Sequence, residues 1–220
     1  QSLSFHFKYA FRFSKESNLG RLFPHTYQGI GVSYHTFFSP AELGNPVSVY
    51  AFQGSRIAQL SPRLSLDYEW NFGASFGWKK YDELSNPQNV LIGSKINAYI
   101  NLGFLLNWQV HRYWKLTAGV DLTHFSNGNT HYPNGGLNVI GGRIGIVRTL
   151  GVDELPGGVT PGRLFIKPHV SYDLVIYGAT RKRGLIGDDV SSMIPGSFGV
   201  AGINFAPMYN FNNYFRAGLS

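Results

Sequence analysis

Residues 62–78 decide the fold, and they read PRLSLDYEWNFGASFGW. Apolar side chains alternate there with small or polar ones, the apolar set being Leu64, Leu66, Tyr68, Trp70, Phe72, Ala74, Phe76 and Trp78. Because successive side chains of a strand point to opposite faces, this period of two predicts a strand with one apolar and one polar face. The stretch exceeds both the ~5–6 residues of a typical globular strand and the ~9–11 that cross a bilayer. On the polar face, Asp67 and Glu69 are expected to be balanced by Arg63, Arg12 or Arg143.

The same alternation continues on both sides of this stretch. Further strands are predicted at residues 2–13, 29–38, 96–108, 116–126, 138–146, 164–176, 198–205 and 211–219, with a weaker one at 47–54. Residues 14–27, 79–95, 150–162 and 178–195 are predicted loops. The pattern indicates an all-β fold, an antiparallel transmembrane β-barrel of roughly 8–12 strands, with residues 1–220 as one outer-membrane domain.

Composition narrows the class of protein. Charged residues make up 14% of the chain and aromatic residues 15%, with 27 glycines and no cysteine. The charged fraction is well below the roughly 25% of a soluble domain. No apolar run is long enough to span a bilayer as a helix, which excludes a helical membrane protein. A soluble β-sandwich or lipocalin-like barrel stays open on composition, and the long alternating segments favour the membrane barrel.

The net charge of +7 comes from cations scattered over strands and loops. An anionic membrane surface is therefore a better partner than nucleic acid. The histidines show no metal-ligand spacing, and no cofactor is expected.

The candidate site lies in the hairpin of residues 112–149. The apolar row that begins at Leu116 ends in His124 and Ser126, two residues apart on one face, and the intervening loop is rich in turn formers. A register centred near His131 places Asn138 opposite His124. Asp121 points to the other face.

A histidine, a serine and an amide at one end of an apolar surface suggest nucleophilic catalysis. His124 would take the proton of Ser126, and Asn138 would orient the imidazole ring. Asn127 and the N–H groups of the Gly128 turn would donate to a developing oxyanion. The alternative is that these polar groups only mark the membrane interface.

The run Thr123-His124-Phe125-Ser126-Asn127-Gly128 and the later run Pro133-Asn134-Gly135-Gly136-Leu137-Asn138 resemble the lipid A 3-O-deacylase (PagL) family of outer-membrane barrels. Residues 86–89 and 92–99 are also similar to the Bacteroidetes-type relatives labelled acyloxyacyl hydrolase. The resemblance covers roughly residues 60–149. It implies a serine esterase that removes the 3-O-linked hydroxyacyl chain of lipid A.

By motif position the resemblance makes His124 the base, Ser126 the nucleophile and Asn127 an oxyanion contributor. The family's third member is a glutamate, and Asn138 stands in the matching position. An amide can orient a histidine but carries no charge to stabilise imidazolium, which predicts low activity or dependence on another acid. Gly128 also follows Asn127 directly, where the family has a small residue before its glycine.

These observations lead to an outer-membrane esterase acting on lipid A or lipopolysaccharide in the outer leaflet. Arg181, Lys182 and Arg183 are predicted to bind lipid phosphates, as are Lys79 and Lys80, with ordinary solvated loop charge as the alternative. The rival functions are a non-catalytic barrel with a lipid-binding or structural role, and a small pore. Side chains fill the interior of barrels of ~8–10 strands, which disfavours the pore.

Overall fold

The computed structural model describes residues 1–150, 162–181, 184–186, 191–193 and 196–219. The chain divides into two compact units, which are described separately. The first comprises Gln1–Arg12 with His25–Gly158, and the second Phe13–Pro24 with Val159–Ser220. The expectation that residues 1–220 form one domain stays a prediction.

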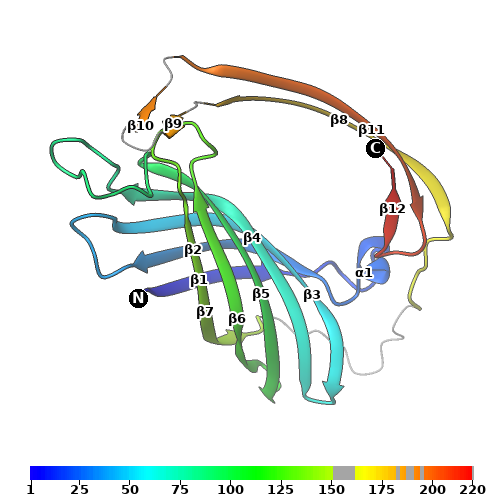
Figure 1. The fold of residues 1–220 in the computed structure, drawn as a ribbon. Coiled ribbons are helices and arrows are strands. Elements are labelled where there is room, and N and C mark those ends of the chain that lie inside the picture. Colours follow the sequence, from blue (N-terminus) through cyan, green and yellow to red (C-terminus); the bar gives the residue numbers. More distant parts are fainter. Residues whose placement is uncertain (151–161, 182–183, 187–190, 194–195, 220) are drawn as a thin grey trace. The chain divides into compact units, whose positions relative to one another are not determined.

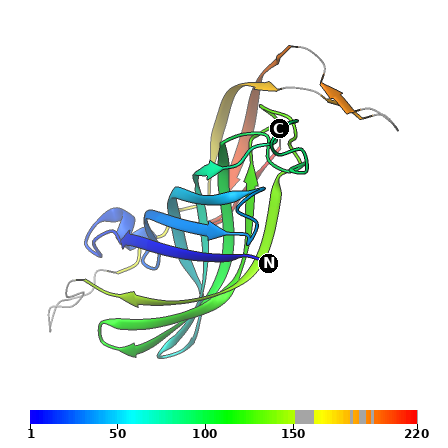
Figure 2. The same cartoon turned by 90° about the vertical axis from the view of Figure 1, so that its left-hand side faces the viewer.

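The first unit is a single seven-stranded sheet. Its strands are β1 (Leu3–Phe11), β2 (Tyr27–Thr36), β3 (Gly44–Ser61), β4 (Leu64–Trp78), β5 (Ile96–His111), β6 (Trp114–Ser126) and β7 (Leu137–Arg148). Each strand pairs antiparallel with the next in sequence order, so β1 and β7 form the edges. Figures 1 and 2 show the strong curl of this sheet, and the predicted antiparallel, barrel-type all-β fold is confirmed.

The two faces of this sheet reverse the pattern of a soluble protein. Along β4 as far as Ser75 the buried side chains are polar: Ser65, Asp67, Glu69, Asn71 and Ser75. The side chains between them are mostly large and apolar and at least partly exposed, with Trp70 41% and Phe72 57% exposed. The same apolar outer row runs along β5 and β6, as the alternation predicts. Within the described residues, no helix is long and apolar enough to cross a membrane.

The alternation fails at the end of β4. Trp78 was predicted on the outer row, but it is only 3% exposed and lies inside. Gly77, with φ of +89°, breaks the period of two immediately before it. The Trp78 ring stacks on Phe37 with centroids 5.5 Å apart, and its Nε1–H donates to Ser75 Oγ at 2.8 Å.

The segment predicted as a weak strand at 47–54 is the longest strand of the sheet, β3. Register shifts lie between Gly44 and Val47, between Arg56 and Ala58, and between Gln59 and Ser61. The first shift accommodates Pro46, since proline is tolerated in sheets at bulges. The other two interrupt the alternation, which is why the sequence pattern missed the second half of this strand.

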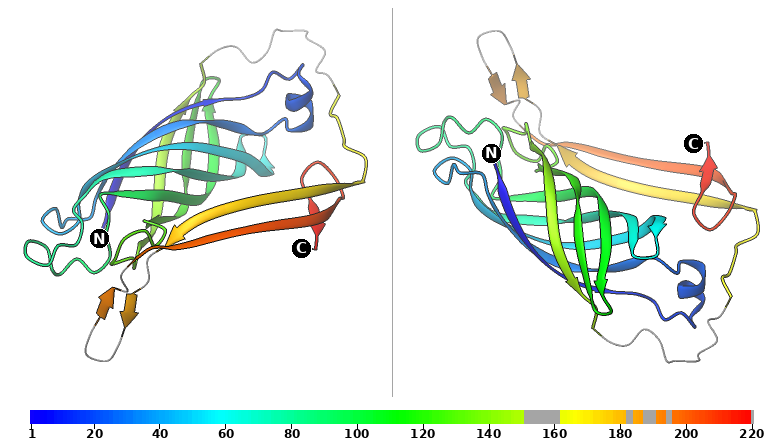
Figure 3. Two further views of the ribbon diagram at one scale, coloured as in Figure 1. Left: turned by 90° about the horizontal axis from the view of Figure 1, so that it is seen from above. Right: turned by 90° about the horizontal axis from the view of Figure 1, so that it is seen from below.

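The second unit contains the helix α1 (Asn18–Leu22), which begins where Ser17 Oγ accepts the N–H of Gly20 at 3.0 Å, within the segment predicted as a loop. The strands β8 (His169–Arg181), β11 (Phe198–Asn210) and β12 (Arg216–Gly218) form one sheet, and β9 (Gly184–Ile186) pairs with β10 (Ser191–Met193) (Figure 3). Strand β8 begins at His169, later than the predicted start at residue 164. Asn213 joins the helix to this unit, because its Nδ2 donates to Leu22 O at 3.2 Å and to Leu164 O at 2.8 Å.

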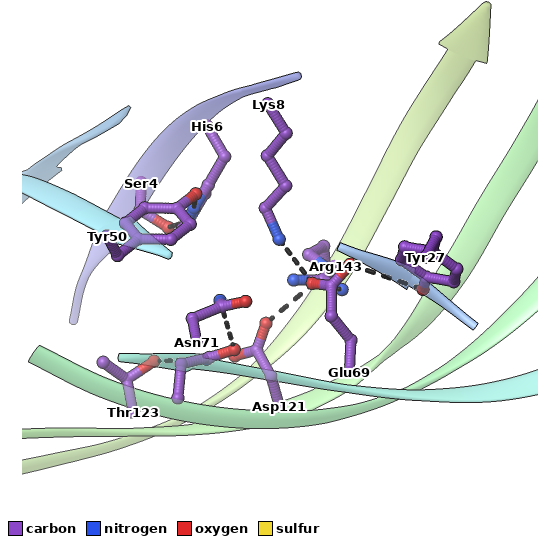
Figure 4. A network of polar contacts seen from close by, with 11 residues as sticks. Ser4, His6, Lys8, Tyr27, Tyr50, Glu69, Asn71, Asp121, Thr123 and Arg143 are labelled. Atoms are coloured by element: carbon purple, nitrogen blue, oxygen red, sulfur yellow. Dashed lines mark hydrogen bonds and ion pairs between the residues drawn. The ribbon is translucent and has the colours of Figure 1, made fainter. Parts of the chain in front are cut away.

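An ionic network inside the first unit links its two edge strands (Figure 4). The Glu69 carboxylate on β4 contacts Lys8 Nζ from β1 and Arg143 Nη2 from β7, the latter at 2.9 Å. Arg143 Nε also lies 3.9 Å from Asp121 Oδ2. Of the predicted balancing cations only Arg143 takes this role, and Lys8 provides the other charge.

The Glu69→Gln substitution tests this network. It removes the anion that Lys8 and Arg143 share and leaves both cations with Asp121 alone, a loss that in buried pairs costs about 3–5 kcal/mol. We expect the variant to unfold at a markedly lower temperature in detergent, measured by the heat-dependent mobility shift of the folded protein in electrophoresis.

The matched control is Asp67→Asn on the same face of β4. Asp67 Oδ1 accepts the Ser65 hydroxyl at 2.9 Å, and an asparagine retains that acceptor. An equal loss of thermal stability in both variants would contradict a specific role of the Glu69 network.

Candidate active site

The hairpin of β6 and β7 has the predicted register. His124 pairs with Asn138, and Leu122 pairs with Ile140. The turn from β5 to β6 is short, whereas residues 127–136 form a long loop at the other end of the hairpin. Barrels of the outer membrane have short periplasmic turns and longer outside loops. His124 and Asn138 lie at the long-loop end of the sheet, next to residues 127–136. In such barrels the long loops are at the outer end.

Buried neighbours fix which way the site side chains point. Thr123 and Phe125 face the interior, with Phe125 only 1% exposed. The Phe125 ring packs edge-on against Trp78, with centroids 4.9 Å apart, in a cluster that also holds Tyr99 and Ile92. Since strand side chains alternate, His124 and Ser126 lie on the outer face, both half-buried, as the sequence indicates.

His124 and Asn138 are joined directly. His124 Nδ1 lies 2.7 Å from Asn138 Oδ1. The amide oxygen is an acceptor only, so Nδ1 carries the proton and Nε2 retains a lone pair. Asp121 is on the inner face with Arg143, and no ion pair between His124 and a carboxylate occurs in the part of the chain that the structure describes.

Ser126 begins the long loop. Its Oγ accepts the N–H of Gly128 at 3.1 Å, and Gly128 has φ of +63°. Among the described residues no hydrogen bond joins Ser126 to His124. Asn127 Nδ2 donates to His131 O at 2.9 Å and to Pro133 O at 3.4 Å, while its Oδ1 is buried without a partner. In this conformation Asn127 therefore organises the loop.

The predicted phosphate-binding cations are only partly described. Arg181 is exposed at the end of β8, and Lys182 and Arg183 lie outside the described residues. Lys79 and Lys80 are exposed at the start of the β4–β5 loop. In the described part of the chain, no group of three His, Cys, Asp or Glu side chains is placed to hold a metal ion.

The β4–β5 loop opens with a turn centred on Asp82. Its Oδ1 accepts the N–H and the hydroxyl of Ser85, both at 2.9 Å, and the N–H of Leu84 at 3.2 Å. The bonds from Ser85, followed by the bond from Leu84, hold the pKa of Asp82 below its ordinary value. These three bonds hold the turn.

Sequence reasoning missed one residue of the site. Gly136, with φ of +66°, lies against the His124 ring, and its N–H donates to Leu91 O at 3.2 Å. The Gly135-Gly136 pair predicts a turn. The contact of Gly136 with Leu91 cannot be predicted from a local sequence pattern, because the two residues lie far apart in the chain.

The fold and this site define a β-barrel-type protein with a polar cluster on its exposed apolar wall. Residues 3–147 match the family model described as Lipid A 3-O-deacylase (PagL). The chain therefore belongs to the lipid A 3-O-deacylase family, whose members are outer-membrane ester hydrolases. No curated protein and no solved structure matches it.

The hydrogen bond to Asn138 predicts one tautomer of the His124 ring. In Asn138→Ala the Nδ1–H loses its acceptor, and we expect a mixture of the two neutral tautomers. Nitrogen NMR of the protein in micelles, with selectively labelled histidine, measures the tautomer ratio. His131, whose Nδ1 lies 3.1 Å from Thr130 Oγ1, serves as the internal reference. An unchanged His124 signal would contradict this role of Asn138.

Proposed function

We propose that the chain is an outer-membrane esterase that removes the 3-O-linked hydroxyacyl chain of lipid A. Ser126 is the nucleophile, His124 the base and Asn138 the residue that orients the base. The observation that carries this proposal is the 2.7 Å contact of His124 Nδ1 with Asn138 Oδ1, next to Ser126 on the exposed apolar face. The family match supports lipid A as the substrate class.

The tautomer set by Asn138 suits the first chemical step. Nε2 of His124 accepts the Ser126 proton while Oγ attacks the ester carbonyl. To reach Nε2, the hydroxyl leaves the Gly128 N–H that it accepts in the free protein. The bond between the carbonyl carbon and the sugar oxygen then breaks, His124 gives its proton to that oxygen, and the acyl group stays on Ser126. Water, deprotonated by His124, attacks this acyl ester in the same way and releases the fatty acid.

The oxyanion donors proposed are the Gly128 N–H and Asn127 Nδ2. When Ser126 Oγ turns away, the Gly128 N–H is left without an acceptor and can meet the developing charge. Asn127 takes this role only by exchanging one of its two loop carbonyls, His131 O or Pro133 O, for the oxyanion. Substrate binding thus couples the loop to the reaction.

The location of the site suits a substrate that is itself part of a membrane. The outer row next to His124 and Ser126 is apolar, with Leu122 47% and Ile140 83% exposed. We infer that this wall faces lipid in the outer leaflet, so that an acyl ester reaches Ser126 without leaving the bilayer. We propose that Lys79, Lys80, Arg181, Lys182 and Arg183 pair with lipid phosphates.

A non-catalytic, lipid-binding role is the second candidate. It is favoured by the neutral Asn138, because an amide gives no charge to stabilise imidazolium. The two functions differ in one measurable outcome, the mass of lipid A in cells that make the protein.

Mass spectrometry of lipid A from cells expressing the wild type, Ser126→Ala and His124→Ala at matched levels tests the activity. We expect the loss of one hydroxyacyl mass with the wild type and intact lipid A with both variants. His131→Ala, which changes a loop histidine without a proposed catalytic role, should behave as the wild type. Intact lipid A in all cells with folded protein would support the non-catalytic function.

The Asn138→Glu substitution tests the missing charge. A carboxylate at this position would orient His124 and also stabilise the imidazolium that forms during attack, so we expect kcat to rise about tenfold. Rates on purified lipid A in mixed micelles measure the change. A lower kcat in Asn138→Glu would show that the site is built around the amide.

A further inference from the structure

Two residues lie against the His124 ring. Asn138 Oδ1 holds Nδ1, and Gly136 lies beside Cε1, the ring atom between Nδ1 and Nε2. A Cβ at position 136 would stand 3.2 Å from His124 Cε1, 3.9 Å from Nε2 and 3.0 Å from Phe125 O. Any side chain at this position would press on the imidazole and on the strand that carries it.

Gly136 is in turn fixed by the β4–β5 loop. Its N–H donates to Leu91 O at 3.2 Å. The two loops approach so closely that a Cβ at Gly93 would lie 2.5 Å from Pro133 O. Ile92, 1% exposed, anchors the first of these loops in the aromatic cluster that also holds Phe125.

Asn89 organises that loop. It is 3% exposed, and all four of its side-chain bonds go to backbone. Nδ2 donates to Glu42 O at 3.0 Å and to Lys79 O at 2.7 Å, and Oδ1 accepts the N–H groups of Leu91 at 3.2 Å and Ile92 at 3.0 Å. The position of Leu91 O, and therefore of Gly136, depends on this amide.

We propose that Gly136 and Asn89 are positioning residues for His124. Asn89 fixes Leu91, the Leu91 carbonyl holds Gly136, and the bare backbone of Gly136 leaves the imidazole room to keep its bond to Asn138, with Nε2 free for Ser126. This inference rests on the proposed function, because it assigns the two residues to the base of that reaction. They touch no reacting atom and act only through the ring.

The test uses the full chain in mixed micelles with purified lipid A. In Gly136→Ala the new methyl group pushes on the ring by a few tenths of an ångström, and we expect kcat to fall about tenfold with KM within about twofold, since a misplacement of ~1 Å can cost about 10²-fold in rate. The matched control is Gly77→Ala. Gly77 also has positive φ, +89°, but a Cβ there would meet only Asn45 O and Pro46 Cα, at an ordinary 3.7 Å. We expect its kcat to stay within a few-fold of the wild type.

A second pair of variants separates the positioning of His124 from the general stability of the loop. Asn86 donates to Glu42 O at 2.8 Å and to Lys80 O at 3.0 Å, much as Asn89 does, but Leu91 and Ile92 donate to Asn89 and not to Asn86. We therefore expect Asn89→Ala to lower kcat at least tenfold more than Asn86→Ala. Equal losses in the two variants, or in Gly136→Ala and Gly77→Ala, would overturn the proposal.

A spectroscopic measurement keeps this inference apart from the proposed function. Nitrogen NMR of labelled histidine is expected to show a changed tautomer ratio for His124 in Gly136→Ala and an unchanged one in Gly77→Ala. If the wild type does not cleave lipid A, the proposed function fails, while the His124 signal still decides whether Gly136 positions the ring. A wild-type signal in Gly136→Ala would overturn the inference even in an active enzyme.

Discussion

Successive side chains of a β-strand point to opposite faces, and in the seven-stranded sheet this places most polar side chains inside, beside a buried aromatic cluster, and most large aliphatic ones outside. The interior rows are stabilised by one another: Asn71 donates to Asn101 at 2.9 Å, and Asn101 donates to Thr123 at 2.8 Å. A polar group in the outer row has no such partners from the interior. His124, Ser126 and Asn138 are therefore polar residues in an otherwise apolar outer row. Their polar contacts come from the β6–β7 hairpin itself.

The filled interior also favours an outer position for the proposed site. Behind the site it is occupied by the cluster around Phe125, Trp78 and Tyr99, and farther along the strands by the ionic network of Glu69. Buried side chains thus give β6 a rigid inner face, and Phe125 lies between the two outward residues that must keep their spacing. A filled interior fits a scaffold for a wall-side site better than a conducting pore.

Sequence alone predicts the parts of this structure that depend on periodicity. The long alternating runs gave the strands, and the turn-rich loop between two of them gave the pairing of His124 with Asn138. Periodicity does not predict what depends on a single φ angle or a distant contact. Trp78 turns inward after Gly77, β3 continues through three register shifts, and Lys8 rather than Arg12 meets Glu69. The contact of Gly136 with Leu91 belongs to the same class.

Asn138 separates two tasks that a carboxylate would combine. The amide oxygen orients the imidazole and fixes the proton on Nδ1, which requires only a hydrogen-bond acceptor at 2.7 Å. Stabilising the imidazolium that forms on attack requires charge, and the nearby carboxylate of Asp121 faces inward to Arg143. At a site bordered by apolar side chains this charge matters more than in water, since fewer water dipoles screen it. In the proposed mechanism the remaining donors, at Gly128 and Asn127, stabilise the oxyanion rather than the cation, so Asn138 supplies the orientation of His124 and the loop supplies the electrostatic stabilisation.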